Sequence, residues 1–315
     1  MMSNAILMAL VPVFFVLLLG YAAGRLHIVD NLHVGALNAL VMDFAVPASL
    51  FAATASASRT AMIEQIPLFV VLALTMALLY TAWYLAARGL KISRPDASIQ
   101  ALTIGFPNLA GVGLPILTSI VGPAGVVPVA VALATGSILI SPVTLIIAEM
   151  DAAKVRGEVM ALRQILTAIG RAVTKPVVLA PALGIMFSLS NVSLGALAHA
   201  CLALIGSSAA GVALFLTGAI LSAHRFQLNL KVAAATVTAD IVRPLAAIAV
   251  THVVPISPDT ARTAVLLAAV PSGFFGILFA VNYRLDSATV GSVVIASTGV
   301  SAVTLAIAIA MLFPS

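Results

Sequence analysis

Charged residues are scarce in this chain. Asp, Glu, Lys and Arg make up only 8% of its 315 residues, whereas soluble domains contain about 25%. Hydrophobic residues make up 62%, and the mean hydropathy is +1.20. The core of a soluble domain cannot absorb that much apolar surface. The composition therefore excludes an ordinary soluble domain.

Motifs of several enzyme classes are also missing. The single cysteine, Cys201, lies in an apolar segment, so it offers neither a disulfide framework nor a cysteine metal site. The chain has no HExxH motif, and it has no GxxxxGK[ST] motif that would support ATP-driven pumping. We therefore expect no enzymatic activity, no organic cofactor and no bound metal.

Apolar stretches of about 18 residues or more recur along the chain, each long enough to cross roughly 30 Å of hydrocarbon as a helix. Spanning segments are helical because lipid offers backbone polar groups no other partner. The first stretch is expected to remain as a span, because no basic residues precede it. We predict an all-α polytopic membrane protein with ten spans, at residues 4–24, 32–53, 66–87, 97–121, 126–148, 173–189, 196–221, 232–254, 261–281 and 288–312.

The basic residues fall mainly on one side of these ten spans. With loops assigned to alternate sides, twelve of the 15 share the side opposite the N-terminus: Arg25, Arg88, Lys91, Arg94, Lys154, Arg156, Arg163, Arg171, Lys175, Arg225, Lys231 and Arg284. The positive-inside rule makes that side cytoplasmic. We therefore expect an inner (cell) membrane protein with both termini outside. The net charge of +5 then reflects orientation in the lipid bilayer rather than nucleic-acid binding.

An internal repeat is visible at an offset of 164 residues, which places Pro12 on Pro176, Gly20 on Gly184, Phe51 on Phe215 and Pro107 on Pro271. Each copy holds five spans, an odd number, so the second copy must enter the membrane from the opposite side. We predict two inverted five-helix repeats, residues 1–148 and 165–315, joined by a cytoplasmic linker at 149–164 that we expect to form a short amphipathic helix. Inverted repeats are typical of secondary transporters.

Spans four and nine carry helix-breaking residues at matching positions. Proline removes a backbone donor and clashes with the preceding turn, and glycine lets backbones approach closely. Half-helix N-termini in such breaks suit a carboxylate, although simple kinking of packed helices is the alternative. The candidate binding residues are Pro107, Asn108, Gly111 and Gly113 in span four and Pro271, Ser272 and Gly273 in span nine. Hydroxyls that could line the same cavity, or bond their own helix, belong to Thr135, Ser137, Ser141, Ser297, Thr298 and Ser301.

Three ionisable residues lie near the centres of spans, where a charge is costly and indicates function or a partner: Asp43, Asp240 and Arg243. Asp240 and Arg243 are three residues apart, so we expect them to pair on one helix face. Arg243 is also a candidate to attract or gate an anion, with Asp240 tuning it. Asp43 is the candidate for coupling to a cation, H+ or Na+; capping of backbone freed by Pro47 is the alternative.

Five segments of the chain read GYAAGR, FAVPASLF, GFPNLAGVGLPIL, RP at Arg243 and Pro244, and VPSGFFGILFAVNY. With these segments the chain resembles the auxin efflux carrier family of membrane transport proteins. The family includes the plant PIN-type auxin carriers and bacterial relatives described as malonate or other organic-acid permeases. The match extends over essentially the whole chain.

The resemblance implies ten helices in five-plus-five inverted repeats, with broken crossover helices four and nine and with scaffold and transport domains. It also implies elevator-like transport of small carboxylates, and a homodimer through the scaffold helices. The family's crossover residues match Pro107, Asn108 and Pro271, but Ser272 stands where the plant carriers have a second asparagine. That difference argues against auxin itself as the substrate.

A secondary carrier for a small mono- or dicarboxylate is therefore the leading hypothesis. The alternative within transport is a cation/proton exchanger or a sodium-coupled symporter of related crossover fold. Such a protein would more naturally present paired acidic residues beside the breaks, and span nine has none. An intramembrane aspartyl protease would need a GxGD context, whereas Asp43 and Asp240 lie in VMDFA and ATADI.

Overall fold

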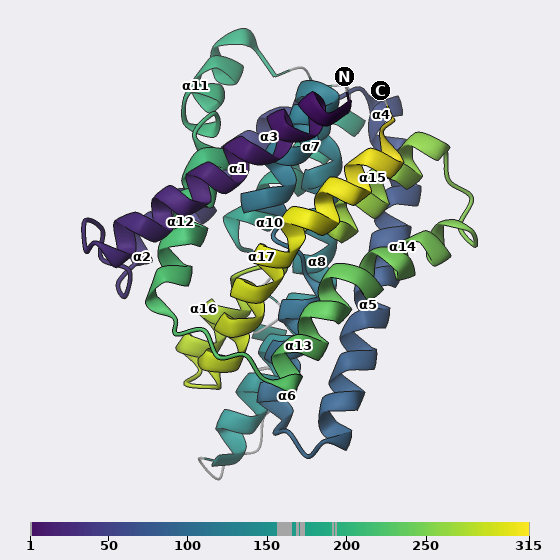
Figure 1. The fold of residues 1–315 in the computed structure, drawn as a ribbon. Coiled ribbons are helices and arrows are strands. Elements are labelled where there is room, and N and C mark those ends of the chain that lie inside the picture. The colour runs from purple at the N-terminus through teal and green to yellow at the C-terminus, as the bar shows by residue number, and fades with distance from the viewer. Residues whose placement is uncertain are drawn as a thin grey trace.

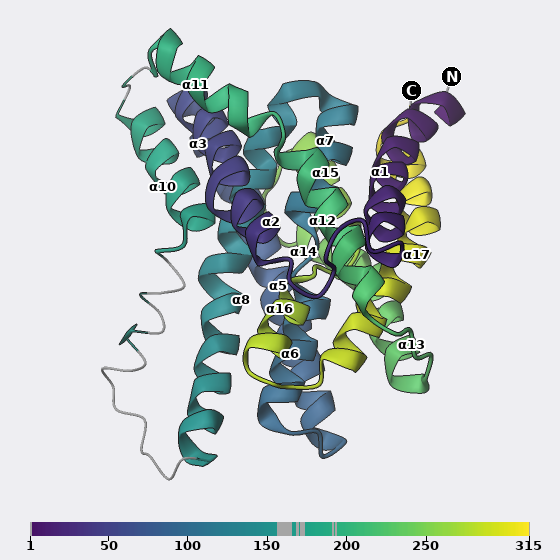
Figure 2. The ribbon, with the colours of Figure 1, turned by 90° about the vertical axis from the view of Figure 1, so that its left-hand side faces the viewer.

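The computed structural model describes residues 2–155, 166–167, 170, 174–190, 192 and 194–314. Within these ranges the regular structure is helical, and one isolated β-bridge is present. The helices form a bundle in which the marked N- and C-termini lie near each other at one end in both views (Figure 1 and Figure 2). The chain is thus an all-helical protein, as its composition predicts.

The first half of the chain supplies one group of helices, which Figure 1 shows in purple to teal. These are α1 (Met2–Arg25), α2 (Gly35–Ala39), η1 (Leu40–Ala45), α3 (Val46–Ser56), α4 (Arg59–Ile63), α5 (Ile66–Gly89), α6 (Arg94–Gly105), η2 (Leu109–Gly113), α7 (Leu114–Val121), η3 (Gly122–Gly125) and α8 (Val126–Val155).

The second half supplies the green and yellow helices. They are α10 (Pro176–Leu189), α11 (Ala196–Gly206), α12 (Ala209–Ala223), α13 (Leu230–Val237), η4 (Thr238–Val242), α14 (Arg243–Thr251), α15 (Pro258–Ala269), α16 (Phe275–Asn282) and α17 (Ser287–Leu312).

Seven helical segments among the described residues are long and apolar enough to cross a membrane. They are Leu7–Arg25, Gly35–Ser56, Arg59–Gly89, Leu109–Asp151, Ala196–Ala223, Leu230–Thr251 and Ser287–Leu312. The helix at Pro176–Leu189 is apolar but shorter. The chain is therefore a multi-pass membrane protein.

The predicted spans at 97–121 and 261–281 are each broken near the middle. The first stops at Gly105 and resumes at Leu109, and the second stops at Ala269 and resumes at Phe275. Each break begins at a residue that precedes a proline, Phe106 or Val270, and both of these have extended backbone. A residue before proline is pushed out of the α region by the proline ring, which accounts for the position of both breaks.

Three wide π-helical turns mark other prolines. The turns η1, η2 and η4 each end two residues before one, at Pro47, Pro115 and Pro244. A proline within a helix lacks its N–H and clashes with the carbonyl four residues earlier. An inserted π turn leads the chain around that clash without ending the helix.

The predicted boundaries need correction at two places. The helix expected at 126–148 continues as α8 to Val155, so the beginning of the predicted linker at 149–164 is helical; residues 156–165 lie outside the described part. The span expected at 196–221 is interrupted at Ser207 and Ser208, between α11 and α12. Serine competes with the helix by bonding nearby backbone, and both hydroxyls donate to carbonyls three residues earlier.

Two helix pairs pack through glycine. α1 lies along α12, where Gly20 contacts the backbone of Phe215, and α10 lies along α3, where Gly184 contacts Phe51 and Thr54. A Cβ atom at either glycine would overlap the facing helix. Small residues at such contacts let membrane helices approach closely, because van der Waals packing is the main attraction between helices in lipid.

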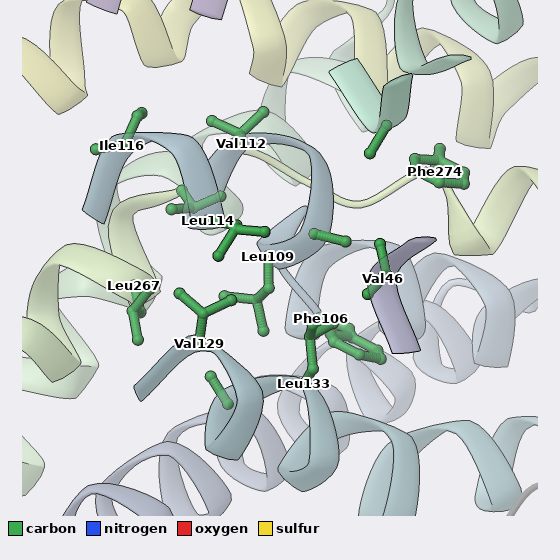
Figure 3. Packing of buried hydrophobic residues seen from close by; sticks show 14 of the residues in the cluster. Val46, Phe106, Leu109, Val112, Leu114, Ile116, Val129, Leu133, Leu267 and Phe274 are labelled. Atoms are coloured by element: carbon green, nitrogen blue, oxygen red, sulfur yellow. The ribbon is translucent and has the colours of Figure 1, made fainter. Parts of the chain in front are cut away.

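The buried core surrounds the break between α6 and η2. Leu109, Val129, Leu133 and Leu267 gather around it in Figure 3, and each is fully buried. These side chains come from η2, α8 and α15, so the unwound segment is enclosed by protein on several sides. This placement meets the condition under which irregular backbone is tolerated at membrane depth.

Candidate functional site

The two breaks pair with each other in antiparallel fashion. The Asn108 N–H donates to the carbonyl of Pro271 at 2.8 Å, and the Gly273 N–H donates to the carbonyl of Phe106 at 3.2 Å. These bonds bracket the bridge between Pro107 and Ser272. A Cβ atom on Gly273 would lie 2.9 Å from the Phe106 oxygen, so only glycine fits here without displacing the partner strand.

Asn108 caps the helix that follows its own break. Its Oδ1 accepts from the Gly111 N–H at 3.1 Å, and its Nδ2 donates to the Thr217 hydroxyl of α12 at 3.3 Å. A side chain on Gly111 would overlap this amide and Thr217, so Gly111 keeps the space open. Asn108 thereby joins the break to a helix from the other half of the chain.

Arg243 binds the ends of the two helices that stop at the breaks. Its guanidinium is fully buried and donates to the carbonyls of Ile104, Ala268 and Val270, at 2.7 Å in the case of Ala268. These carbonyls end α6 and α15, where a helix leaves unpaired acceptors and carries partial negative charge. The arginine satisfies the C-termini of both helices at once, and so stabilises the crossing of the two broken segments.

The pairing expected between Asp240 and Arg243 is not formed. The ion pairs found among the described residues do not include it, and all three guanidinium nitrogens of Arg243 donate to carbonyls. Asp240 lies inside the π turn η4, which ends just before Arg243. The i,i+3 rule holds for the 3.6-residue α turn, and a wider turn moves the two side chains apart around the helix.

Beside the crossing, the first turn of α16 has unused polar groups. Ser272 is fully buried, and its hydroxyl has no hydrogen-bond partner among the described residues. Within the same residues, the N–H groups of Phe275 and Gly276 also find no acceptor. A helix N-terminus exposes such donors and carries partial positive charge. Asn108 caps the matching turn in the other break, whereas Ser272 leaves this one free.

A cavity of about 980 Å³ lies next to this region, although neither Ser272 nor Gly276 is among the residues of its wall. The aromatic rings of Phe106 and Phe275 form part of its wall, with centroids 5.3 Å apart. Farther along, the wall carries Lys175 and Arg225, and the Lys175 ammonium lies 5.3 Å from the ring centre of Phe279. The cavity therefore combines apolar rings near the crossing with basic groups at a distance from it.

The remaining predicted site residues fall in different places. Asp43 and Ser137 line this cavity, whereas the Thr135 hydroxyl donates to the carbonyl of Val131 in its own helix. Gly113 packs against Leu109 and Leu267 in the core, and Thr298 is buried in α17. Across the described residues, no three His, Cys, Asp or Glu side chains are grouped so that they could hold a metal ion.

Ser297, one of the candidate hydroxyls, bonds both the Ser272 N–H and Asp240. Sequence reasoning missed two residues of this region: Thr217, which accepts from Asn108, and Lys175, which lines the cavity. Thr217 lies in an unbroken α-helix, where an isolated hydroxyl gives no periodic signal. Lys175 counted only toward the charge bias between the two sides of the membrane, because nothing near it in sequence indicates a cavity.

A multi-pass helical bundle with two broken helices crossing at its centre defines a class, that of membrane transport proteins. Residues 5–309 match the family described as membrane transport protein, and the chain belongs to that family. This confirms the resemblance to auxin efflux carriers. The chain is also similar to the uncharacterized transporter YfdV of Escherichia coli K12, E. coli O157:H7 and Shigella flexneri, at 28% identity over 281 residues, which is 89% of each chain.

Proposed function

We propose that this protein is a secondary active transporter of a small organic anion, a mono- or dicarboxylate of the malonate type, across the cell membrane. The observation that carries the proposal is the antiparallel crossing at Pro107 and Ser272, which leaves the first turn of α16 with free donors. A carboxylate placed there would accept from the N–H groups of Phe275 and Gly276 and from the Ser272 hydroxyl.

Ten spans in two inverted five-helix repeats are part of the same proposal. Repeat-related contacts support it, because Gly20 on α1 meets Phe215 on α12, while Gly184 on α10 meets Phe51 on α3. Each position differs from its counterpart by the same offset of 164 residues. Similar caps also begin the two broken helices, where Ser93 accepts from Asp96 and Ser257 accepts from Thr260. Two related halves supply the two conformations that alternating access needs.

Alternating access by an elevator-like movement would carry the crossing between two openings. The 980 Å³ cavity opens beside Lys175 and Arg225, both on the side that the charge bias makes cytoplasmic. A second cavity of about 1100 Å³ lies between α3, α4, α11 and α15, lined in part by Gln65 and His199. In this proposal the structure represents the state open to the cytoplasm, with both termini outside.

The apolar wall and the basic mouth of the cavity favour an organic anion over a metal cation. Lys175 and Arg225 attract negative charge toward the opening, and the rings of Phe106 and Phe275 accept an apolar part of the solute. Asp43 also lies on this wall and remains a candidate coupling group. A homodimer, which the family resemblance implies, is testable by native mass measurement in detergent.

Uptake of labelled mono- and dicarboxylates, malonate included, into proteoliposomes tests the proposal. We expect Ser272→Ala and Asn108→Ala to reduce uptake by at least tenfold while thermal melting in detergent changes little. Ser301→Ala is the matched control, because the Ser301 hydroxyl is equally buried but bonds the Thr298 carbonyl of its own helix. Carboxylate uptake no greater than in protein-free vesicles, or full uptake by Ser272→Ala, would refute the proposed site.

A further inference from the structure

Asp240 presents a buried carboxyl group with one oxygen unused. Its side chain is 1% exposed, and its Oδ1 accepts from the Ser297 hydroxyl at 2.6 Å. Its Oδ2 has no hydrogen-bond partner in the described part of the chain. Native proteins rarely leave a buried polar atom without a hydrogen-bond partner, so such an atom indicates a bound ligand or a functional role.

Ser297 links this carboxyl group to the crossing. The same Ser297 oxygen that donates to Asp240 accepts the Ser272 N–H at 2.9 Å. Two hydrogen bonds therefore join Asp240 to the backbone at the start of the α16 turn. A change in the charge of Asp240 is therefore transmitted through Ser297 to the first turn of α16, where we propose that the anion binds.

We propose that Asp240 is the proton-binding group of a proton–anion symport, with the proton on Oδ2. The inference rests on the proposed function of the crossing as an anion site. In the proposed cycle a proton from water binds Oδ2 together with the anion, and both are released on the other side; no covalent bond of the solute changes. The anion binds more tightly when Asp240 is neutral, because an ionised carboxyl group nearby would repel it.

For a monocarboxylate, the charge on Arg243 supports a stoichiometry of one proton to one anion. When the site is empty, ionised Asp240 and Arg243 sum to zero. With a proton on Asp240 and a monovalent anion beside α16, the sum is again zero. A buried site that is neutral in both states avoids moving net charge through a low-dielectric interior.

A proton fits this site better than a sodium ion does. Hard metal cations in proteins need about six oxygen ligands, whereas the oxygens gathered here are those of Asp240, Ser272 and Ser297. Asp240 borders neither of the two cavities, and Arg243 lies nearby with its positive charge. A proton needs no added space and only the one free oxygen.

The other charged groups on the elements packed against η4 lie toward helix ends. α13 carries Lys231, α14 carries Arg243, α15 carries Asp259 and Arg262, α6 carries Arg94 and Asp96, and α17 begins after Asp286. Of these, Arg243 is the closest to Asp240 in sequence, and an arginine keeps its proton in proteins. The pH dependence should therefore follow one group rather than a cluster.

Infrared difference spectroscopy of the purified protein tests proton binding without any substrate. We expect a pH change to produce a carboxyl C=O band that disappears in Asp240→Asn and persists in Asp43→Asn, the matched control in the cavity wall. Ser297→Ala should move the pH at which the band changes, and it is the second variant if Asp240→Asn does not fold. A band that persists in Asp240→Asn, or that titrates unchanged in Ser297→Ala, overturns the inference.

The second test of the inference measures anion binding and transport. In the wild type, raising the pH through the titration should weaken anion binding by up to tenfold per pH unit, since one linked proton has that slope. In Asp240→Asn the affinity should no longer depend on pH, and uptake should be the same with and without an inward proton gradient. If the wild type moves no carboxylate, the proposed function fails. If it moves carboxylate, with Asp43→Asn rather than Asp240→Asn losing the gradient response, only this inference fails.

Discussion

The backbone N–H of Asn108 donates to the carbonyl of Pro271 at 2.8 Å, joining the middle of one broken helix to the middle of another. Each proline keeps the residue before it out of the α region. The two unwound segments then supply hydrogen-bond partners to some of each other's backbone groups. We propose that the donors they leave unsatisfied at α16 bind the solute. The breaks and the proposed binding site thus have the same physical origin.

Gly273→Ala should weaken this crossing. The added Cβ would lie 2.9 Å from the Phe106 oxygen and 3.3 Å from the Pro107 oxygen, so the two segments must separate. We expect a loss of about 1–3 kcal/mol of stability, as for other overpacked sites, measured as a lower melting temperature, together with loss of uptake. Gly299→Ala is the control, because nothing lies within 4 Å of its Cβ position in α17. Its expected effect is neutral or slightly stabilising, and equal melting of both variants would contradict the close contact.

Arg243→Met should destabilise the protein by leaving the carbonyls of Ile104, Ala268 and Val270 without a donor. An unsatisfied buried acceptor costs about 1–3 kcal/mol, partly offset because burying the guanidinium charge is itself unfavourable. We expect a clear fall in melting temperature in detergent. Arg262→Met removes an exposed arginine that pairs with Asp259 at 3.2 Å and should change melting little. A stable Arg243→Met protein would mean that water or other donors reach these carbonyls.

The sequence was sufficient to predict the two helix breaks and to predict that they occupy corresponding positions in the two halves of the chain. Pro107 and Pro271 act locally on the residues before them, and their matching offset predicted that the breaks correspond. The three carbonyls bound by Arg243 were not predictable, because Ile104 and Ala268 approach it only through tertiary packing. The pairing expected between Asp240 and Arg243 failed for a local reason, namely the π turn before Pro244.

Lys175→Gln tests whether the basic mouth of the cavity draws in the anion. Lys175 lies on the cavity wall just before α10, so removing its charge should weaken the attraction for an incoming carboxylate. We expect the half-saturating concentration for uptake from the cytoplasmic side to rise about fivefold, on the order of 1 kcal/mol, and the effect to shrink at high salt. Lys231→Gln, on α13 outside the cavity lining, is the control. An effect of the same size in both variants would assign the change to net charge alone.

Cysteine labelling decides the orientation in the membrane. Cys201, which is exposed on α11, is first replaced by alanine to give a cysteine-free background. An impermeant maleimide added to intact cells should then label Pro314→Cys, near the C-terminus, because the distribution of basic residues predicts that both termini lie outside. Glu158→Cys, in the predicted linker at 149–164, should be labelled only after the membrane is opened. The reverse labelling pattern would mean that the protein has the opposite orientation in the membrane. The cavity beside Lys175 would then open to the outside, and the proposed proton and anion would enter from the opposite face.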